Sequence, residues 1–225
     1  MSFAPFYFLI STFYFEQSLM IRTIIDISHW EDPIDFKKVA AAGIVAVIAK
    51  ATQGAAGIDI AYAKFKKLAT KYEFLWGSYH FGTGSKVNVQ VDHYLKIAKP
   101  TDRELVCLDF ESNPKGPTMT LTQAREFISL FQHLTGRYPV LYSGHLLKEN
   151  LGRKPDDLLS KCRLWLAQYG PKPVLPVGWK KYTLWQYTDG HEGPPPRRVP
   201  GIGPCDRNQF NGTTARLRKL WPFAK

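Results

Sequence analysis

Short apolar runs alternate with amphipathic stretches along almost the whole chain after Thr23. The apolar runs are rich in β-branched and aromatic residues, which favour strands, and the stretches between them show the residue spacing of helices. This repeated alternation is typical of parallel strands joined by helices. Eight strands are predicted, at Thr23–Ser28, Ile44–Ala51, Phe74–Phe81, Leu105–Glu111, Pro139–Ser143, Arg163–Tyr169, Tyr182–Tyr187 and a last short run near Cys205–Phe210.

Helices are predicted between the early strands but not between the late ones. The stretch Leu121–Thr135 shows the helical pattern best, because five apolar residues recur at helical spacing and should face the core. The connections from Tyr169 to Tyr182 and from Tyr187 to Cys205 are rich in Pro and Gly and leave no room for a full helix, so the barrel should close without its last helices. The five apolar residues are Ala124, Phe127, Ile128, Phe131 and Leu134, and the other predicted helices are Asp35–Ala42, Ile60–Tyr72 and Lys86–Lys99.

No linker, composition shift or internal repeat divides the chain after Met20, so residues 21–225 are predicted to form one domain. Residues 1–20 differ, because Phe3–Phe15 is apolar and aromatic. This run has the apolar centre of a signal peptide but lacks a charged start and a small-residue cleavage site. We expect an N-terminal extension, a weak signal-like segment or a true start at Met20. The run is too short to span a bilayer and no later run has membrane length, so no stable membrane insertion is expected.

The chain carries 30 Lys and Arg against 19 Asp and Glu, a formal net charge of +11. This charge favours polyanionic partners such as nucleic acid, anionic lipid or the acidic polymers of a bacterial wall. The cations are spread along the sequence, as on an ordinary solvated surface. A nucleic-acid-binding protein would show a basic stripe interleaved with aromatic residues or a known motif, and neither is visible. Nucleic acid is therefore not the expected partner.

The three cysteines, Cys107, Cys162 and Cys205, show no Cys-x-x-Cys pair and no histidine at metal-ligand spacing. A zinc site or a redox motif is therefore not expected. Cys107 lies in an apolar run and should be a buried small hydrophobic residue. Cys162 and Cys205 could form a disulfide if the fold brought them together, but the sequence does not favour that pairing.

Four acidic residues are predicted to meet at one end of the barrel. In a β/α barrel, functional side chains gather at the carboxyl ends of the strands. Asp26 lies near the end of the first predicted strand, Asp109 and Glu111 lie near the end of the fourth, and Asp206 lies at the last strand. Residues at opposite ends of the sequence can therefore face one pocket.

Asp109 and Glu111 are two residues apart, which puts both side chains on one face of a strand, separated by about 7 Å along it. Glycosidic cleavage uses one carboxylic acid to protonate the leaving oxygen and a second carboxylate to stabilise or attack the sugar, at a separation of roughly 5 to 10 Å. Leu108 and Phe110 offer apolar walls, and clustered negative charge raises the pKa of a neighbouring carboxyl group. We therefore interpret Glu111 as the proton donor.

Aromatic residues cluster near the same strand ends, where a sugar-binding site needs flat apolar faces edged with hydrogen-bonding groups. The better candidates for a cleft stand next to glycine, in Tyr79-His80-Phe81-Gly82 and Tyr142-Ser143-Gly144, and part of the set is expected to be core. His29 and His80 are interpreted as hydrogen-bonding residues rather than metal ligands. The full set is Trp30, Tyr79, His80, Phe81, Tyr142, Trp165, Tyr169, Trp185 and Tyr187.

Six motifs, in their order along the chain, resemble those of glycoside hydrolase family 25, the Chalaropsis-type lysozymes that include many phage and bacterial muramidases. The resemblance covers nearly everything after Met20. Its signature Leu-Asp-x-Glu stands here at residues 108–111. The other five motifs are Asp26-Ile27-Ser28-His29-Trp30, Gly77-Ser78-Tyr79-His80-Phe81, Tyr142-Ser143, Leu184-Trp185-Gln186-Tyr187-Thr188 and Asp206-Arg207-Asn208-Gln209-Phe210.

The resemblance implies a single TIM-like β/α barrel of five β/α units followed by three strands with few or no helices. It implies cleavage of the β-1,4 bond between N-acetylmuramic acid and N-acetylglucosamine in peptidoglycan, with Glu111 as general acid/base and Asp109, Asp26 and Asp206 lining the site. The substrate's N-acetyl group can replace a carboxylate nucleophile, so the roles of the aspartates stay open. No metal or cofactor is implied. The expected substrate-binding residues are Tyr79, His80, Phe81, Tyr142, Trp185, Gln186 and Asn208.

Many relatives carry wall-binding repeats after the barrel, whereas this chain ends fifteen residues after Phe210. We therefore expect a monomer that binds walls through its cleft and its basic surface, and that acts either after secretion or after release as an endolysin. A family 18 chitinase is a rival barrel, but its Asp-x-x-Asp-x-Asp-x-Glu pattern needs Asp where this chain has Glu104 and Cys107. A catalytically inactive glycan-binding barrel would keep the aromatic residues and lose an acid, whereas all four acids are present.

Overall fold

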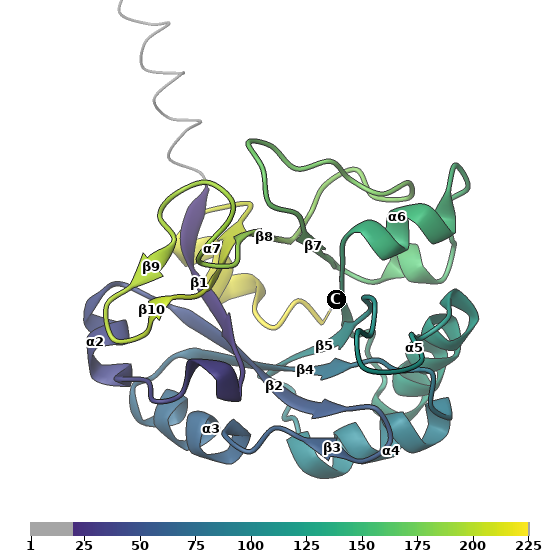
Figure 1. Ribbon diagram of the computed structural model, residues 1–225, viewed down its shortest axis with the longest axis horizontal. Coiled ribbons are helices and arrows are strands. Elements are labelled where there is room, and N and C mark those ends of the chain that lie inside the picture. The colour runs from purple at the N-terminus through teal and green to yellow at the C-terminus, as the bar shows by residue number, and fades with distance from the viewer. Residues whose placement is uncertain (1–19, 225) are drawn as a thin grey trace, which may run out of the picture.

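The computed structural model describes residues 20–224, so the expected N-terminal extension or signal-like segment lies, apart from Met20, outside the described residues. Eight strands close into a barrel, because β11 pairs with β8 on one side and with β1 on the other (Figure 1). All eight strands expected from the sequence are present. In barrel order they are β1 Ile21–Ile27, β2 Ala46–Gln53, β4 Leu75–Phe81, β5 Leu105–Asp109, β6 Val140–Ser143, β7 Leu164–Ala167, β8 Leu184–Thr188 and β11 Asp206–Phe210.

The first five barrel strands, β1, β2, β4, β5 and β6, are each followed by an α-helix before the next barrel strand, and the loops after β7 and β8 carry none (Figure 1). The prediction of five β/α units followed by three strands is confirmed. Helix α7, after β11, was not expected. The helices are α2 Phe36–Ala41, α3 Tyr62–Lys71, α4 Val87–Ala98, α5 Leu121–Thr135, α6 His145–Leu151 and α7 Thr214–Leu220; short 3-10 turns are η1 His29–Glu31 and η2 Leu159–Lys161, and small outer strands are β3 Gly57–Ile58, β9 Arg198–Val199 and β10 Gly203–Pro204.

The last barrel strand runs against the others. Strands β1 to β8 of the barrel pair in parallel, whereas β11 is antiparallel to both of its neighbours. The carboxyl ends of seven strands and the amino end of β11 therefore form one rim. This geometry explains how Asp206, the first residue of β11, comes to lie opposite Asp26 near the end of β1.

Two apolar layers hold the barrel, one inside it and one between its strands and the helices. Successive side chains of a strand point to opposite faces, so Ile24 belongs to the inner layer and Ile25 to the outer one. Helix α5 begins at a capping box formed by Thr120 and Gln123 and ends at Gly136, whose φ of 74° suits glycine. Of its five predicted core residues, Ala124, Phe127, Ile128 and Phe131 are fully buried, whereas Leu134, in the last turn, is 50% exposed and was wrongly expected to be core.

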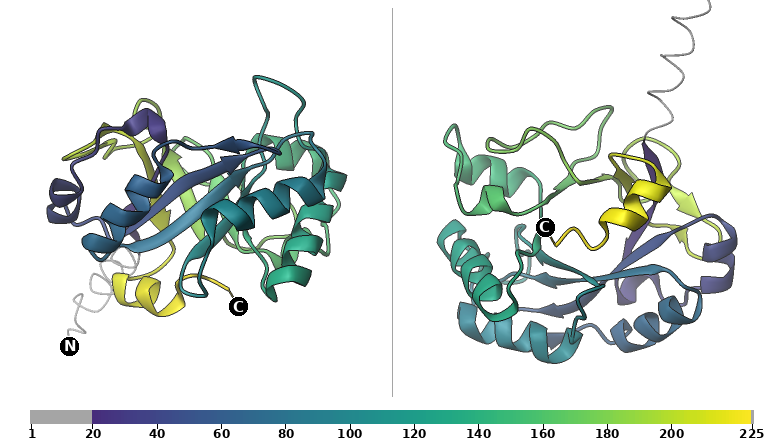
Figure 2. Two further views of the ribbon diagram at one scale, coloured as in Figure 1. Left: turned by 90° about the horizontal axis from the view of Figure 1, so that it is seen from below. Right: turned by 180° about the vertical axis from the view of Figure 1, so that it is seen from behind.

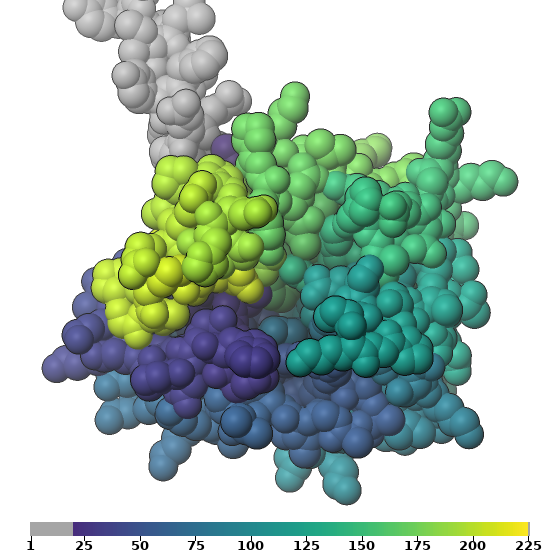
Figure 3. Space-filling model, viewed as in Figure 1, coloured from purple at the N-terminus to yellow at the C-terminus, as the bar shows by residue number. Residues whose placement is uncertain are grey.

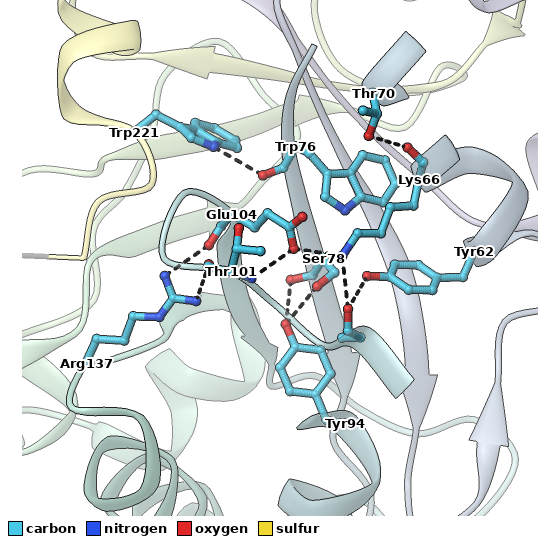
Figure 4. A network of polar contacts seen from close by, with 11 residues as sticks. Tyr62, Lys66, Thr70, Trp76, Ser78, Tyr94, Thr101, Glu104, Arg137 and Trp221 are labelled. Carbon is cyan, nitrogen blue, oxygen red and sulfur yellow. Dashed lines mark hydrogen bonds and ion pairs between the residues drawn. The ribbon is translucent and has the colours of Figure 1, made fainter. Parts of the chain in front are cut away.

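The mouth of the barrel opposite the rim is covered by α7 and the chain that follows it, which lie on the side turned away from the viewer in Figure 1 (Figure 2). Polar contacts tie this end together (Figure 4). The Trp221 indole donates a hydrogen bond to the Trp76 carbonyl at 3.1 Å, and Lys66 forms an ion pair with Glu104 at 2.9 Å. Arg137 donates to the carbonyl oxygens of Glu104 and Thr101.

All three cysteines are buried and free, so the Cys162–Cys205 disulfide that the sequence left open is not formed. Cys107, 1% exposed, packs inside the barrel as a small hydrophobic residue, as predicted. Within residues 20–224, no helix is long and apolar enough to cross a membrane.

Candidate active site

The four predicted acids meet in one small pocket at the rim. The pocket holds about 70 Å³ and lies at the top of the barrel interior. Each acid comes from a strand end: Asp26 from β1, Asp109 from β5, Glu111 from just beyond β5, and Asp206 from β11. The other lining residues are Tyr79, Tyr142, Trp165 and Gln186.

Glu111 reaches the pocket from a loop rather than from a strand. Strand β5 ends at Asp109, and Phe110 turns its side chain away into the outer apolar layer, where it is fully buried. Glu111 then returns to the side on which Asp109 lies. The two carboxyl groups therefore share the pocket as expected, although the sequence analysis put both on the strand.

Asp26 is held by two side-chain amides. Asn208 Nδ2 donates to one carboxylate oxygen at 2.7 Å, and Gln186 Nε2 donates to the other at 2.9 Å. The amides are themselves fixed, because Trp165 Nε1 donates to Asn208 Oδ1 at 2.6 Å and the Tyr142 hydroxyl donates to Gln186 Oε1 at 2.9 Å. This chain of donors leaves Asp26 no freedom to turn and favours its charged form.

The carboxyl groups of the pocket differ in pKa. Burial raises the pKa of Asp26, but the hydrogen bonds from Asn208 and Gln186 oppose that effect and leave it at about 6. Burial, together with the negative charge of Asp26, raises the pKa of Glu111 to about 7. The pKa of Asp206 rises to about 10, because it is buried and lies beside Asp26.

Asp109 is the least solvated of the group. It is 4% exposed, and its Oδ1 has no hydrogen-bond partner among the described residues. Burial, and next the charge of Glu111, raise its pKa well above the ordinary aspartate value. A buried polar atom without a partner costs roughly 1–3 kcal/mol, and this oxygen is free to accept a hydrogen bond from a group that enters the pocket.

Lys50 is a site residue that the sequence analysis did not single out. It projects from β2, its Nζ donates to Gln53 Oε1 at 2.7 Å, and it lies over the Phe81 ring, 4.9 Å from the ring centre. Burial lowers its pKa, and the charges of Asp109 and Glu111 oppose that shift. The sequence signal was a single cation inside the apolar run Ile44–Ala51.

The predicted substrate-binding residues fall into two groups, according to whether their side chains point into the barrel or outward to the helices. Tyr79, Tyr142 and Gln186 line the acid pocket, and Asn208 lies behind it as the donor to Asp26. Phe81 does not line the pocket; it lies under Lys50 and is paired with Asp109 across β4 and β5. The structure does not bring His80 or Trp185 to the pocket.

His80 and Trp185 follow and precede pocket residues on their strands, so their side chains point to the opposite face. His80 is fully buried between β4 and the helices: its Nε2 donates to Gln90 Oε1 at 3.2 Å, Thr52 bonds to its Nδ1 at 2.8 Å, and burial lowers its pKa to about 4. Trp185 packs in the outer layer and donates to the Gln168 carbonyl at 2.7 Å. Both residues support the strands that carry the site.

A larger groove of about 720 Å³ adjoins Lys50 on the rim. It runs between the β2–β3 hairpin, residues 83–85 and residues 113–117, and one wall is His29, whose Nδ1 lies 2.8 Å from Asp59 Oδ2. Trp30, predicted as a cleft aromatic, stands beside His29 and is 74% exposed. Figure 3 shows a hollow between the purple, teal and yellow-green segments of this rim.

The arrangement suits acid catalysis on a polar polymer. It supplies a protonated carboxyl group near neutrality, a fixed carboxylate and an adjoining open groove. In the part of the chain that the structure describes, no group of three or more His, Cys, Asp or Glu side chains could hold a metal ion. The site offers carboxyl groups at different acidities, which is what two-carboxylate glycoside hydrolysis needs.

Comparisons with known proteins agree with this chemistry. Lysozyme M1 of Streptomyces globisporus is 30% identical over 211 residues, covering 87% of this chain and 70% of that protein. The N,O-diacetylmuramidase of a Chalaropsis species is 26% identical and covers 87% of this chain and 96% of that protein. The crystal structure of a bacterial lysozyme from Streptomyces coelicolor superposes with a TM-score of 0.79 at 28% identity, covering 92% of this chain and 99% of that chain. The model of glycosyl hydrolases family 25 matches residues 25–194, and the chain therefore belongs to that family.

Proposed function

We propose that the chain is a lysozyme whose Glu111 donates the proton that breaks the β-1,4 bond between N-acetylmuramic acid and N-acetylglucosamine in bacterial peptidoglycan. The observation that carries this assignment is the convergence of Glu111, Asp109, Asp26 and Asp206 on one pocket, in which the pKa of Glu111 is about 7. An acid with that pKa keeps its proton near neutral pH and can release it to a leaving oxygen.

In the first step Glu111 protonates the glycosidic oxygen, and positive charge develops on the sugar ring. Asp26, fixed by Asn208 and Gln186, is the best-placed group to remain charged and to stabilise that ring. Attack at the anomeric carbon then comes from a carboxylate or from the substrate's own N-acetyl oxygen, and the unpartnered Oδ1 of Asp109 can accept the N-acetyl N–H. In the second step Glu111, now charged, takes a proton from the attacking water.

Residues 21–225 act, in this proposal, as one catalytic domain that works as a monomer on glycan strands without a cofactor. One closed sheet and two apolar layers run through the described part of this range. Tyr79, Tyr142 and Gln186 contact the sugar bound beside the acids, and the exposed Tyr169, whose hydroxyl donates to Gln186, extends that surface.

The decisive experiment compares the wild type with Glu111→Gln and with Glu126→Gln on purified peptidoglycan. Glu126 is an exposed glutamate on α5, so its substitution is a matched control for the loss of one carboxylate. New reducing ends at muramic acid from the wild type and the control, and none from Glu111→Gln, are expected. Wild-type binding to glycan without new reducing ends would favour the inactive glycan-binding barrel instead.

A further inference from the structure

A second concave site lies at the mouth of the barrel opposite the acid pocket. Its cavity of about 700 Å³ is lined by residues directly before β7 and β8, by the end of β11, by α7 and by the chain after α7. Because β11 is antiparallel, its end and the starts of the parallel strands meet at this mouth. Nothing in the mechanism above uses this cavity.

The rim of this cavity is strongly basic. Lys181, Arg216 and Lys219 line it with exposed side chains, Arg163 lies beside them, and Asp102 is the one carboxylate among the described lining residues. We call Lys181, Arg216 and Lys219 the basic mouth. Within residues 20–224 their side chains make no hydrogen bond or ion pair with the protein, whereas Lys66 and Arg137 nearby are bonded to Glu104 (Figure 4).

The inner wall of the cavity is aromatic and fixed. Phe223 stacks on Phe210 with ring centres 5.8 Å apart and packs edge-on against Trp221 at 5.5 Å. The Tyr182 hydroxyl accepts a hydrogen bond from Gln209 at 2.6 Å. An apolar wall of fixed side chains, edged by cations that bind no other group of the described chain, fits a ligand that has both apolar carbon groups and negative charge.

We propose that the basic mouth binds the phosphodiester units of an anionic polyol-phosphate or sugar-phosphate polymer of bacterial walls; this choice of polymer rests on the proposed function. Three cations around one concavity match a chain of phosphates spaced by small carbon units. The cavity is compact, whereas duplex nucleic acid is held by an extended basic surface. A polymer bound at this mouth leaves the acid pocket open, so the enzyme stays on the wall while it cleaves glycan.

The test measures binding of the full chain to labelled poly(glycerol phosphate), with neutral dextran as the control polymer. The mouth variant carries Lys181→Gln, Arg216→Gln and Lys219→Gln. A matched control carries Lys37→Gln, Lys96→Gln and Lys154→Gln, three exposed lysines on α2, on α4 and in the loop after α6, so that both variants lose the same net charge. A third variant, Lys181→Arg with Lys219→Arg, keeps the charge at the mouth. Thermal unfolding of each variant shows that the fold is kept.

The mouth variant is expected to bind the polymer about tenfold more weakly or worse, the control to bind within about twofold of the wild type, and the arginine variant to keep its affinity. Cleavage of short uncharged glycans should be the same in all four proteins. Equal weakening in the mouth and control variants would overturn the proposal, as would tighter binding of duplex DNA at the mouth. If the wild type binds the polymer but cleaves no glycan, the proposed lysozyme function is wrong, whereas polymer binding at the basic mouth is retained.

Discussion

The two mouths of this barrel gather opposite kinds of ionisable side chain, although they are built from the same strands: carboxyl groups at one and cations at the other. At the rim, four carboxyl groups share a pocket of about 70 Å³, and at the opposite mouth Lys181, Arg216 and Lys219 surround a cavity of about 700 Å³. The acid end is buried and costly, because its carboxyl groups are crowded away from water. The cations of the basic end are exposed to water, so they reduce the stability of the fold little. A net charge of +11 therefore describes neither end, and each end has to be tested by itself.

The largest effect is expected at the acid end. Glu111→Gln keeps the shape of the side chain and removes the proton, so kcat should fall by about 10²–10⁴-fold, the usual contribution of a general acid. Polymer binding at the basic mouth should not change. Steady-state cleavage of a soluble glycan, with Glu126→Gln as the control, measures the effect. A fall of less than tenfold would assign the acid to another residue.

A large effect on stability, without one on activity, is expected at the basic end. Phe223 is 7% exposed and packs against Phe210 and Trp221, so Phe223→Ala should lower the free energy of unfolding by about 2–4 kcal/mol. Urea unfolding measures this change, and kcat at a temperature where the variant is folded should stay within about twofold of the wild type. A matching loss of kcat would show that the two ends are coupled.

A smaller gain in stability is expected when the crowding of acids is relieved. Burial and the charge of Asp26 raise the pKa of Asp206 from 3.8 to about 10, so at neutral pH the folded protein keeps a proton that the unfolded chain has released. That difference lowers stability progressively as the pH rises from about 4. Asp206→Asn should therefore stabilise the protein by about 1–3 kcal/mol at pH 8 and by little at pH 4, with loss of activity.

Urea unfolding at the two pH values measures the Asp206 effect, and Asp92→Asn, at an exposed residue of α4, is its control. Equal stability of Asp206→Asn and the wild type at both pH values would mean that crowding at the acid end is not costly.

The smallest effect is a shift of the pH profile. Activity should fall as the pH rises through about 7, because Glu111 loses its proton there. The positive charge of Lys50 lowers the pKa of Glu111, so Lys50→Met should move this alkaline limb upward by a few tenths of a unit to about one unit. Lys115→Met, at a lysine of the adjoining groove whose charge does not act on the pKa of Glu111, is the control and should leave the limb in place. A downward shift for Lys50→Met would contradict the electrostatic role.

Much of the acid end could be read from local patterns. The strand before Asp109 and the two-residue step to Glu111 are visible in the sequence, and both acids line the pocket. The same alternation argued against His80: once Tyr79 faces inward, its neighbour on the strand must face the helices. Neighbouring residues of the motif Tyr79-His80-Phe81 therefore cannot all bind substrate. The same holds for Trp185, which points to the face opposite to that of Gln186.

The basic end could not be read in this way. Its cations come from the loop before β8 and from α7, a helix that the sequence analysis did not expect, and no motif links them. Lys50 is an intermediate case, because its sequence position is unusual but its contact with Phe81 depends on how β2 and β4 pair.

The sequence by itself determined the strands, the helices between the early strands and the acids at their ends, because these follow from contacts between residues a few positions apart. The tertiary structure decided which residues far apart in the chain meet. Closure by an antiparallel β11 brought Asp206 beside Asp26 and, at the other mouth, carried α7 and its cations to the starts of β7 and β8. Such pairings depend on how a whole barrel closes, and no local pattern encodes that closure.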